Sequence, residues 1–143
     1  MTTRRDFIKN TALATGCLCA GTLAILPACK TVAYILHQVQ SGKIVVRKSD
    51  FGEGRHAVVE VEKLPAPVYV SHLKDGSYSA VLMKCTHRGC EVMPLGDILH
   101  CPCHGSEYTH TGKVIQSPAV EDLRPFTVTD EGDYLYIETA SIQ

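Results

Sequence analysis

Beyond residue 42 the chain alternates short apolar runs with turn residues, a pattern typical of β-strands. No part of this region repeats its apolar residues at the spacing of an amphipathic helix. The runs are separated by Gly, Pro and Asp, so the pattern predicts an all-β domain of roughly eight to ten short strands. Strands are expected at 44–46, 57–62, 68–70, 78–83, 98–99, 113–115, 126–129 and 134–137.

Two loops of this β domain are predicted to carry its chemistry. The first follows a hairpin at Asp75-Gly76, a dipeptide that favours tight turns between antiparallel strands. The second strand of that hairpin leads directly into Cys85, and a turn at Gly96-Asp97 reverses the chain before Cys101. We therefore expect both loops to be held at the ends of strands and folded back on each other.

Each loop offers one thiolate and one imidazole. The first contains Cys85-Thr86-His87 and the second, thirteen residues later, Cys101-Pro102-Cys103-His104. Two thiolates and two imidazoles that converge form a metal site, and this mixed set is that of a 2Fe–2S cluster in which two His replace two Cys on one iron. Zinc is an alternative metal for such ligands, although zinc sites normally pair Cys with Cys and His with His. A metal-free fold with two disulfides would leave both histidines without a role.

The segment Cys85 to Tyr108 resembles the Rieske iron–sulfur proteins, and among them the high-potential branch of the cytochrome bc and bf complexes. The resemblance is carried by Cys-Thr-His-Arg-Gly-Cys, by Cys-Pro-Cys-His and by the Gly-Ser-Glu-Tyr that follows. It is clear as far as Pro118. It implies stacked antiparallel sheets with a small cluster-binding subdomain at about 83–118.

The resemblance also implies a role for each motif residue. The implied ligands are Cys85 and Cys101 on one iron and His87 and His104 on the other. Ser106 would donate a hydrogen bond to a cluster sulfide and Tyr108 to a ligand sulfur. A disulfide between Cys90 and Cys103 would clamp the loops, and Ser117-Pro118-Ala119 would cover the cluster from a third side.

Elementary chemistry agrees with a high-potential cluster. Neutral imidazoles in place of thiolates raise the potential to about −150 to +300 mV, against about −400 mV for all-Cys ferredoxins. Hydroxyl donors to sulfur favour the reduced state further. The outer nitrogens of the His ligands can lose a proton on oxidation, which couples electron and proton uptake. Cys90 and Cys103, the loop cysteines that are not proposed ligands, suit a disulfide in an exported protein. This disulfide would close a loop of about 14 residues and stabilise the fold by roughly 3 kcal/mol.

The first 29 residues are interpreted as an export and anchor segment. Paired Arg4-Arg5 precede an uncharged run at 10–29, which is the pattern of a targeting segment. The pair resembles the twin-arginine signal, which exports folded proteins, and an ordinary Sec signal is the alternative. Leu26-Pro27-Ala28-Cys29 resembles a lipobox, which would lipidate Cys29. We expect a lipid anchor first, an uncleaved span second and cleavage to a soluble form third, with the domain on the periplasmic side.

Length and charge define the rest of the organisation. Residues 30–41 are expected to be a short tether and 42–143 a single domain. Residues 30–143 carry 11 basic and 14 acidic side chains, a net charge of −3. A nucleic-acid-binding domain would be strongly basic, so nucleic acid is excluded as a partner. The histidines outside the motif are expected at the surface: His37, His56, His72 and His110. His100, directly before a ligand, is expected to face away from the side of Cys101.

Three functions of a Rieske electron carrier were compared with the sequence. The first is the iron–sulfur subunit of a quinol-oxidising complex that passes electrons to a cytochrome, and the second is a free-standing periplasmic or lipoprotein carrier. The third, the ferredoxin of an oxygenase, conflicts with the export signal, the cysteine pair and the hydroxyl donors. Arg88 is an argument against the quinol-oxidising complex. High-potential members of the family usually have an apolar residue at this position, and an Arg buried without a partner is costly. If Arg88 is buried in the complex, either the partner supplies a carboxylate to pair with it or this end of the domain docks elsewhere.

Overall fold

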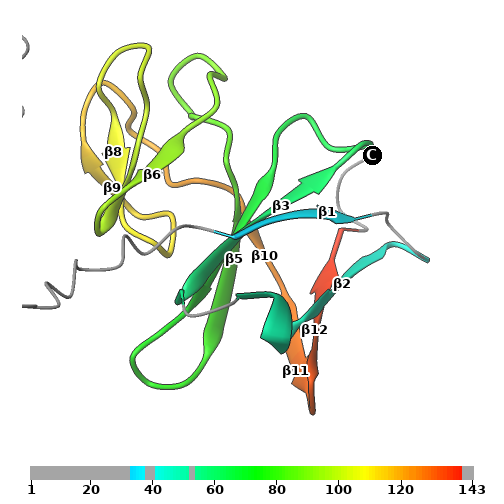
Figure 1. The fold of residues 1–143 in the computed structure, drawn as a ribbon. Helices are drawn as coiled ribbons and strands as arrows, with labels where there is room; N and C mark the ends of the chain where they lie inside the picture. The colour runs from blue at the N-terminus through cyan, green and yellow to red at the C-terminus, as the bar shows by residue number, and fades with distance from the viewer. Residues whose placement is uncertain (1–32, 38–40, 52–53, 140–143) are drawn as a thin grey trace, which may run out of the picture.

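The computed structural model describes residues 33–37, 41–51 and 54–139, and their regular structure is almost entirely β (Figure 1). The all-β prediction is confirmed. One 3-10 helix, η1, lies within the described residues. The elements are β1 (Ala33–His37), β2 (Lys43–Arg47), η1 (Lys48–Phe51), β3 (His56–Val61), β4 (Val68–His72), β5 (Tyr78–Leu82), β6 (Met93–Leu95), β7 (Ile98–His100), β8 (Glu107–Tyr108), β9 (Val114–Gln116), β10 (Pro125–Phe126), β11 (Val128–Glu131) and β12 (Tyr134–Glu138).

The strands of the described residues form three sheets. A central five-stranded sheet has the order β1-β3-β4-β5-β10, and a three-stranded sheet has the order β11-β12-β2. The third sheet, β6-β7-β8-β9, belongs to the segment that carries the two cysteine–histidine loops. It stands apart from the other two at the left of Figure 1. All strand pairs are antiparallel except β1 with β3.

One core lies between the central sheet and the three-stranded sheet. In β2 the buried Ile44 and Val46 alternate with the exposed Lys43 and Arg47 and the half-buried Val45, as a strand with one buried face requires. Opposite them in register, Ile137 pairs with Ile44 and Leu135 with Val46. These four side chains are fully buried. Each stabilises the fold by about 1.5–3 kcal/mol relative to an exposed position.

The central sheet is buried on both faces, because a second core lies beneath the cysteine–histidine loops. In β4, Val68 and Val70 belong to the first core, whereas Tyr69 between them belongs to the second. In β3, Val58 likewise turns to the second core. Burial on both faces explains why these strands read as continuous apolar runs rather than alternating ones. The second core also contains Cys85, Cys101 and Tyr108, so the loops are built on it.

The predicted tether at 30–41 is wrong for Ala33–His37, which form β1. This strand pairs in parallel with β3, from Ala33 opposite Ala57 to His37 opposite Val61. Without β1, β3 would present unpaired backbone groups along the edge of the sheet. The pairing joins residues about 24 positions apart, and local sequence patterns do not reveal it.

The predicted strand at 126–129 is also corrected, since β10 and β11 divide it between the first two sheets. The short strands β6 and β8 were not predicted.

Candidate metal centre

The two cysteine–histidine loops have the same backbone design. In the first loop (85–90), the amide of Cys85 donates to the carbonyl of Cys90, and the amide of Gly89 donates to the carbonyl of Cys85, both at 2.8 Å. In the second loop (101–106), Cys101, Gly105 and Ser106 repeat this pattern at 2.8 and 3.0 Å. Both glycines have φ of +79°, a conformation that side chains disfavour.

Strands hold the first loop in place. The amide of Met83, just past β5, donates to the carbonyl of Pro67 at 2.8 Å, and the amide of Val92 donates to the carbonyl of Met83 at 2.9 Å. Lys84 and Glu91 form an isolated antiparallel bridge that closes the base of the loop. The first loop is thus tied on both sides, as the sequence analysis expected for a ligand loop at a strand end.

The four predicted ligands come from these two loops. Cys85 and Cys101 are free thiols, 3% and 1% exposed. The rings of His87 and His104 lie edge to face with centroids 4.9 Å apart. His87 is half-buried and His104 is exposed. The two loops therefore supply two buried thiols and a pair of adjacent imidazoles, one of them open to solvent.

The donor set fits a Rieske cluster. His87 Nδ1 is buried and has no hydrogen-bond partner among the described residues. Buried polar atoms nearly always have a partner, so an unpartnered imidazole nitrogen beside free thiols suits a metal ligand.

A disulfide links the two loops. Cys90 and Cys103 are bonded with an S–S distance of 2.06 Å, the pairing that the resemblance implied. The sulfur atoms of Cys90, Cys101 and Cys103 lie within 4.8 Å of one another, a spacing that could itself suggest a metal site. Disulfide sulfurs are not thiolates, however, and the thiolate is the form that binds metal. Of these three, only Cys101 remains available as a ligand.

Tyr108 lies against the sulfur of Cys85. Its hydroxyl is 3.2 Å from Cys85 Sγ, and its side chain is fully buried. Burial acts to raise the pKa of the Cys85 thiol, but hydrogen bonds, first that of Tyr108, outweigh burial and hold this pKa below its ordinary value. Burial and the bond to Cys85 raise the pKa of Tyr108. Both directions are those expected when a phenol donates to a thiolate.

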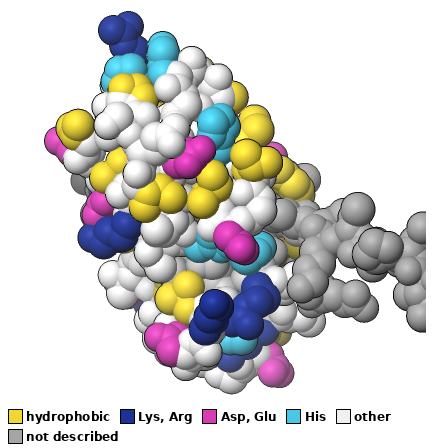
Figure 2. Space-filling view, turned by 90° about the vertical axis from the view of Figure 1, so that its left-hand side faces the viewer, with side chains coloured by type: hydrophobic (Ala, Val, Ile, Leu, Met, Phe, Trp, Pro, Cys, Tyr) yellow, Lys and Arg dark blue, Asp and Glu magenta, His cyan; other side chains and the backbone are white. Residues whose placement is uncertain are grey.

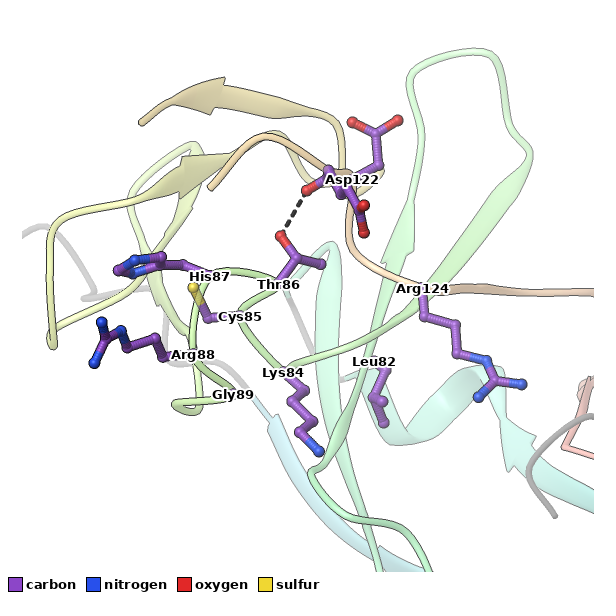
Figure 3. Close-up of a pocket in the computed structure, with 10 residues that line it drawn as sticks. Leu82, Lys84, Cys85, Thr86, His87, Arg88, Gly89, Asp122 and Arg124 are labelled. Atoms are coloured by element: carbon purple, nitrogen blue, oxygen red, sulfur yellow. Dashed lines mark hydrogen bonds between the residues drawn. The ribbon is translucent and has the colours of Figure 1, made fainter. Parts of the chain in front are cut away.

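Thr86 is a site residue that the sequence analysis missed. Its amide donates to Tyr108 Oη at 3.2 Å, and its hydroxyl lies 3.1 Å from the same oxygen. The Thr86 hydroxyl also donates to the carbonyl of Glu121 at 2.7 Å, drawn as the dashed line in Figure 3. Thr86 therefore contacts the predicted tuning residue Tyr108 and ties the first loop to a distant segment. Its place between two ligands was the only available signal.

The segment 117–119 lies beside the second loop. The amide of Ala119 donates to Ser106 Oγ at 3.0 Å, and Gln116 Nε2 donates to the carbonyl of Gly105 at 3.0 Å. Ala119 and Ser106 are buried, whereas Pro118 is exposed. The segment that resembled a covering loop is thus attached to the second loop through a predicted tuning residue.

An open groove of about 610 Å³ lies beside the first loop. Cys85, Thr86 and His87 line it together with Lys84 and Arg88, and the opposite wall contains Glu121, Asp122 and Arg124. In Figure 3 the side chains of His87 and Arg88 extend from the loop in the same direction. The groove brings solvent and charged side chains next to a predicted ligand.

Three of the histidines expected at the surface, His56, His72 and His110, are half-buried instead. His110 Nδ1 lies 3.2 Å from Tyr69 Oη, and the rings of His56 and His110 are 4.6 Å apart. They pack against Tyr69 between β3, β4 and the chain after β8, a contact that depends on tertiary structure. His72 is also half-buried and stacks on Tyr78. His100 Nδ1 is 3.5 Å from Glu107 Oε1 on the neighbouring strand.

Comparison with known proteins finds iron–sulfur subunits among the relatives of this chain. A cytochrome b6-f complex iron-sulfur subunit of Chlorobaculum tepidum is 29% identical over 96% of this chain and 76% of its own length. A cytochrome b6-f complex iron-sulfur subunit 2 of Trichormus variabilis is 30% identical over 72% of this chain and 57% of its own length.

Two solved structures share the fold. The cyanobacterial plasma membrane Rieske protein PetC3 from Synechocystis has a TM-score of 0.56 at 32% identity, covering 64% of this chain and 94% of that one. A chain from the complex of reduced oxygenase and oxidized ferredoxin in carbazole 1,9a-dioxygenase has a TM-score of 0.55 at 25% identity, covering 70% and 95%.

Residues 41–127 match the Rieske [2Fe-2S] domain family. With the fold and the paired loops, this match shows that the chain belongs to the Rieske [2Fe-2S] domain family and that its cofactor is a Rieske 2Fe–2S cluster.

Proposed function

We propose that this electron-transfer protein serves as the iron–sulfur subunit of a quinol:cytochrome oxidoreductase. Its relatives include two cytochrome b6-f complex subunits, which supports this assignment. The observation that carries the proposal is the 3.2 Å contact between Tyr108 Oη and Cys85 Sγ. A hydroxyl donor to a ligand sulfur stabilises the more negative, reduced state, and a high potential is what quinol oxidation requires.

In this proposal Cys85 and Cys101 hold one iron, and His87 and His104 hold the other. The cluster, when bound, supplies one-electron redox chemistry, and the protein supplies tuning and access. In this proposal, the exposed imidazole of His104 accepts a hydrogen bond from quinol through its outer nitrogen. That nitrogen can take up a proton as an electron arrives, so the imidazole holds the proton that accompanies the electron.

The ligand assignment has a direct test in iron content. Cys85→Ser and Cys101→Ser should each abolish stable iron binding, because each removes a thiolate. The double substitution Cys90→Ala with Cys103→Ala should retain iron in the freshly purified protein. Iron retained in Cys85→Ser, or lost at once in the disulfide variant, would contradict the assignment.

Membrane attachment on the periplasmic side is part of the proposal. The predicted signal and anchor residues, including Arg4, Arg5 and Cys29, lie outside the described residues. Among the described residues no helix is long and apolar enough to cross a membrane. Support comes from the resemblance of 1–29 to an export signal and from the similarity to a plasma membrane Rieske protein. Mass spectrometry of the mature N-terminus would separate a lipidated Cys29 from an uncleaved span.

The reduction potential of the full chain, measured with its cluster against pH, tests the quinol function. We expect a potential well above zero that falls as pH rises near neutrality, because the oxidised state releases an imidazole proton. A low potential that does not change through neutrality would contradict quinol oxidation. Such a result would instead indicate a ferredoxin-like electron carrier.

A free-standing periplasmic carrier is the second candidate, favoured by Arg88. This side chain is exposed beside His87, where burial in an apolar quinol pocket would be costly without a partner. Strand β1 also favours a free-standing carrier, since it fixes part of the expected tether in the central sheet. Copurification with a cytochrome b subunit would favour the complex, and purification alone at full cluster content would favour the carrier.

A further inference from the structure

A second pair of imidazoles lies away from the cysteine–histidine loops. The rings of His56, on β3, and His110, in the chain after β8, are edge to face with centroids 4.6 Å apart. His56 Nδ1 and His110 Nε2 are both buried, and neither has a hydrogen-bond partner among the described residues. Buried polar atoms nearly always have a partner, so two such nitrogens on adjacent rings point to a ligand that both rings bind.

The two rings line a pocket of about 400 Å³. Its lining residues come from the strands and turns of both the central sheet and the third sheet. Asp97, exposed in the turn between β6 and β7, supplies a carboxylate to this lining and forms no ion pair with a described residue. In Figure 2, His side chains lie directly beside an Asp or Glu side chain, above a group of Lys and Arg side chains, the combination of residue types that lines this pocket. Imidazole and carboxylate are ligands that zinc accepts.

Tyr69 holds the ring of His110 in place. Its hydroxyl lies 3.2 Å from His110 Nδ1, and its side chain is fully buried. Burial, then the Asp97 carboxylate, raises the pKa of Tyr69, so the phenol stays neutral. When His110 Nδ1 carries the ring proton and donates it to this oxygen, His110 Nε2 keeps the lone pair that a metal needs. Ligand histidines are normally oriented by such a bond from their other nitrogen.

His56 is held in the form that binds metal. Burial, then His110 and Arg55, keep the pKa of His56 below its ordinary 6.5, so the ring is neutral at neutral pH. A metal requires that neutral form. The guanidinium of Arg55, which also lines the pocket, is directed at backbone carbonyls: it donates to that of His72 at 3.2 Å and to that of Leu73 at 2.6 Å.

We propose that His56 and His110 bind a divalent transition metal of the zinc class, with Asp97 and water completing its coordination. Imidazole ligands favour such metals over magnesium and calcium, which prefer oxygen. This site is separate from the Rieske cluster and does not rest on the proposed electron-transfer function. His56 belongs to the central sheet, whereas His110 and Asp97 belong to the segment that builds the third sheet. A bound metal therefore ties the cluster-binding segment to the rest of the domain.

The probe is Zn²⁺, added to the full chain with its cluster in place and without a histidine tag. Calorimetry should show one equivalent bound at micromolar zinc, unchanged by an excess of Mg²⁺. X-ray absorption at the zinc edge should show nitrogen and oxygen ligands without sulfur. The absence of sulfur separates this site from zinc that has entered the cluster site, and the iron content is recorded in each sample.

The variants isolate the site. His56→Gln and His110→Gln should each weaken zinc binding by more than tenfold, and Asp97→Asn by roughly tenfold. His72→Gln is the matched control, because His72 lines the same pocket but stacks on Tyr78. At a free zinc concentration of about ten times the Kd, the thermal midpoint of the unaltered protein should rise by roughly 5–10 °C. The midpoint of His56→Gln should stay the same.

Each outcome decides for or against the site. Zinc held by nitrogen and oxygen, weakened in His56→Gln and His110→Gln and kept in His72→Gln, supports it. Zinc held by sulfur, or bound equally by all variants, overturns it, as does an equal loss in His72→Gln. No binding even at millimolar zinc also overturns it and assigns the two nitrogens to a buried water. If a His variant loses its iron, the zinc-edge spectrum of the unaltered protein still decides.

Discussion

The backbone amide of Ala119 donates a hydrogen bond of 3.0 Å to the side-chain oxygen of Ser106. The bond joins the segment 117–119 to the second loop, and both residues are buried. Because the Ser106 oxygen accepts this bond, its own proton can be donated to sulfur, and a side-chain hydrogen bond from Ser106 helps to lower the pKa of the Cys85 thiol. A cluster sulfide is the acceptor that the Rieske resemblance implies, so we expect one hydroxyl both to tune the cluster and to hold the segment 117–119.

Replacement of Ser106 by Ala should therefore have two effects. The potential should fall by roughly 40 mV, the equivalent of about 1 kcal/mol for one hydrogen bond. The cluster should also be lost faster at elevated temperature, because the buried amide of Ala119 is left unpaired. Protein-film voltammetry and the decay of visible absorbance measure the two effects. A lower potential with unchanged cluster lifetime would refute the structural half of this prediction.

Tyr108→Phe removes the donor 3.2 Å from Cys85 Sγ while keeping the buried ring. We expect the potential to drop by a similar amount, roughly 40 mV. The iron content should be unchanged. Tyr136→Phe, on β12 in the three-stranded sheet, is the control and should leave the potential as it is. An equal drop in both variants would show that the Tyr108 hydroxyl does not act through the sulfur.

Thr86→Val removes a hydroxyl that contacts Tyr108 Oη and donates to the carbonyl of Glu121. The carbonyl of Glu121 loses its donor, whereas the Thr86 amide still donates to Tyr108 Oη. We expect faster thermal loss of the cluster. Thr86→Ser keeps the hydroxyl and should preserve the lifetime of the unaltered protein. An unchanged cluster lifetime in Thr86→Val, which keeps the shape of the side chain, would show that the Thr86 hydroxyl does not contribute.

The Cys90–Cys103 disulfide should stabilise the two loops by limiting their unfolded forms. In the chain-entropy account a loop of this size contributes roughly 3 kcal/mol. The double substitution Cys90→Ala with Cys103→Ala should lower the thermal midpoint and speed cluster loss. Calorimetry and absorbance follow both. A midpoint unchanged from that of the unaltered protein would mean that the remaining contacts between the loops suffice.

His56 should make stability depend on pH. Burial, then the neighbouring His110 and Arg55, hold the pKa of His56 below its ordinary 6.5, against a weaker opposing effect of Asp97. The unfolded chain therefore binds the proton at higher pH than the folded chain, and stability falls as pH drops below about 6.5. His56→Gln should reduce the loss of thermal midpoint between about pH 7.5 and about pH 5.5. The same loss in both proteins would contradict this assignment.

Local chemistry determined much of this protein. The alternation in β2 and the turn residues between apolar runs predicted an all-β domain, because strand periodicity is a local property. The motif around Cys85 and Cys101 predicted a mixed thiolate and imidazole site, because ligand types and their spacing lie within short segments. The resemblance then implied the pairing of Cys90 with Cys103, which the structure contains.

Contacts between distant segments were decided only by the tertiary structure. The pairing of β1 with β3, the burial of His56 and His110 around Tyr69, and the bond from Thr86 to Glu121 all join residues far apart in the sequence. Such contacts depend on how buried faces pack and on which backbone groups need partners, and no local pattern encodes either. For the same reason, the sequence placed Arg88 beside a predicted ligand, and only the fold showed that its side chain is exposed and lines the groove beside His87.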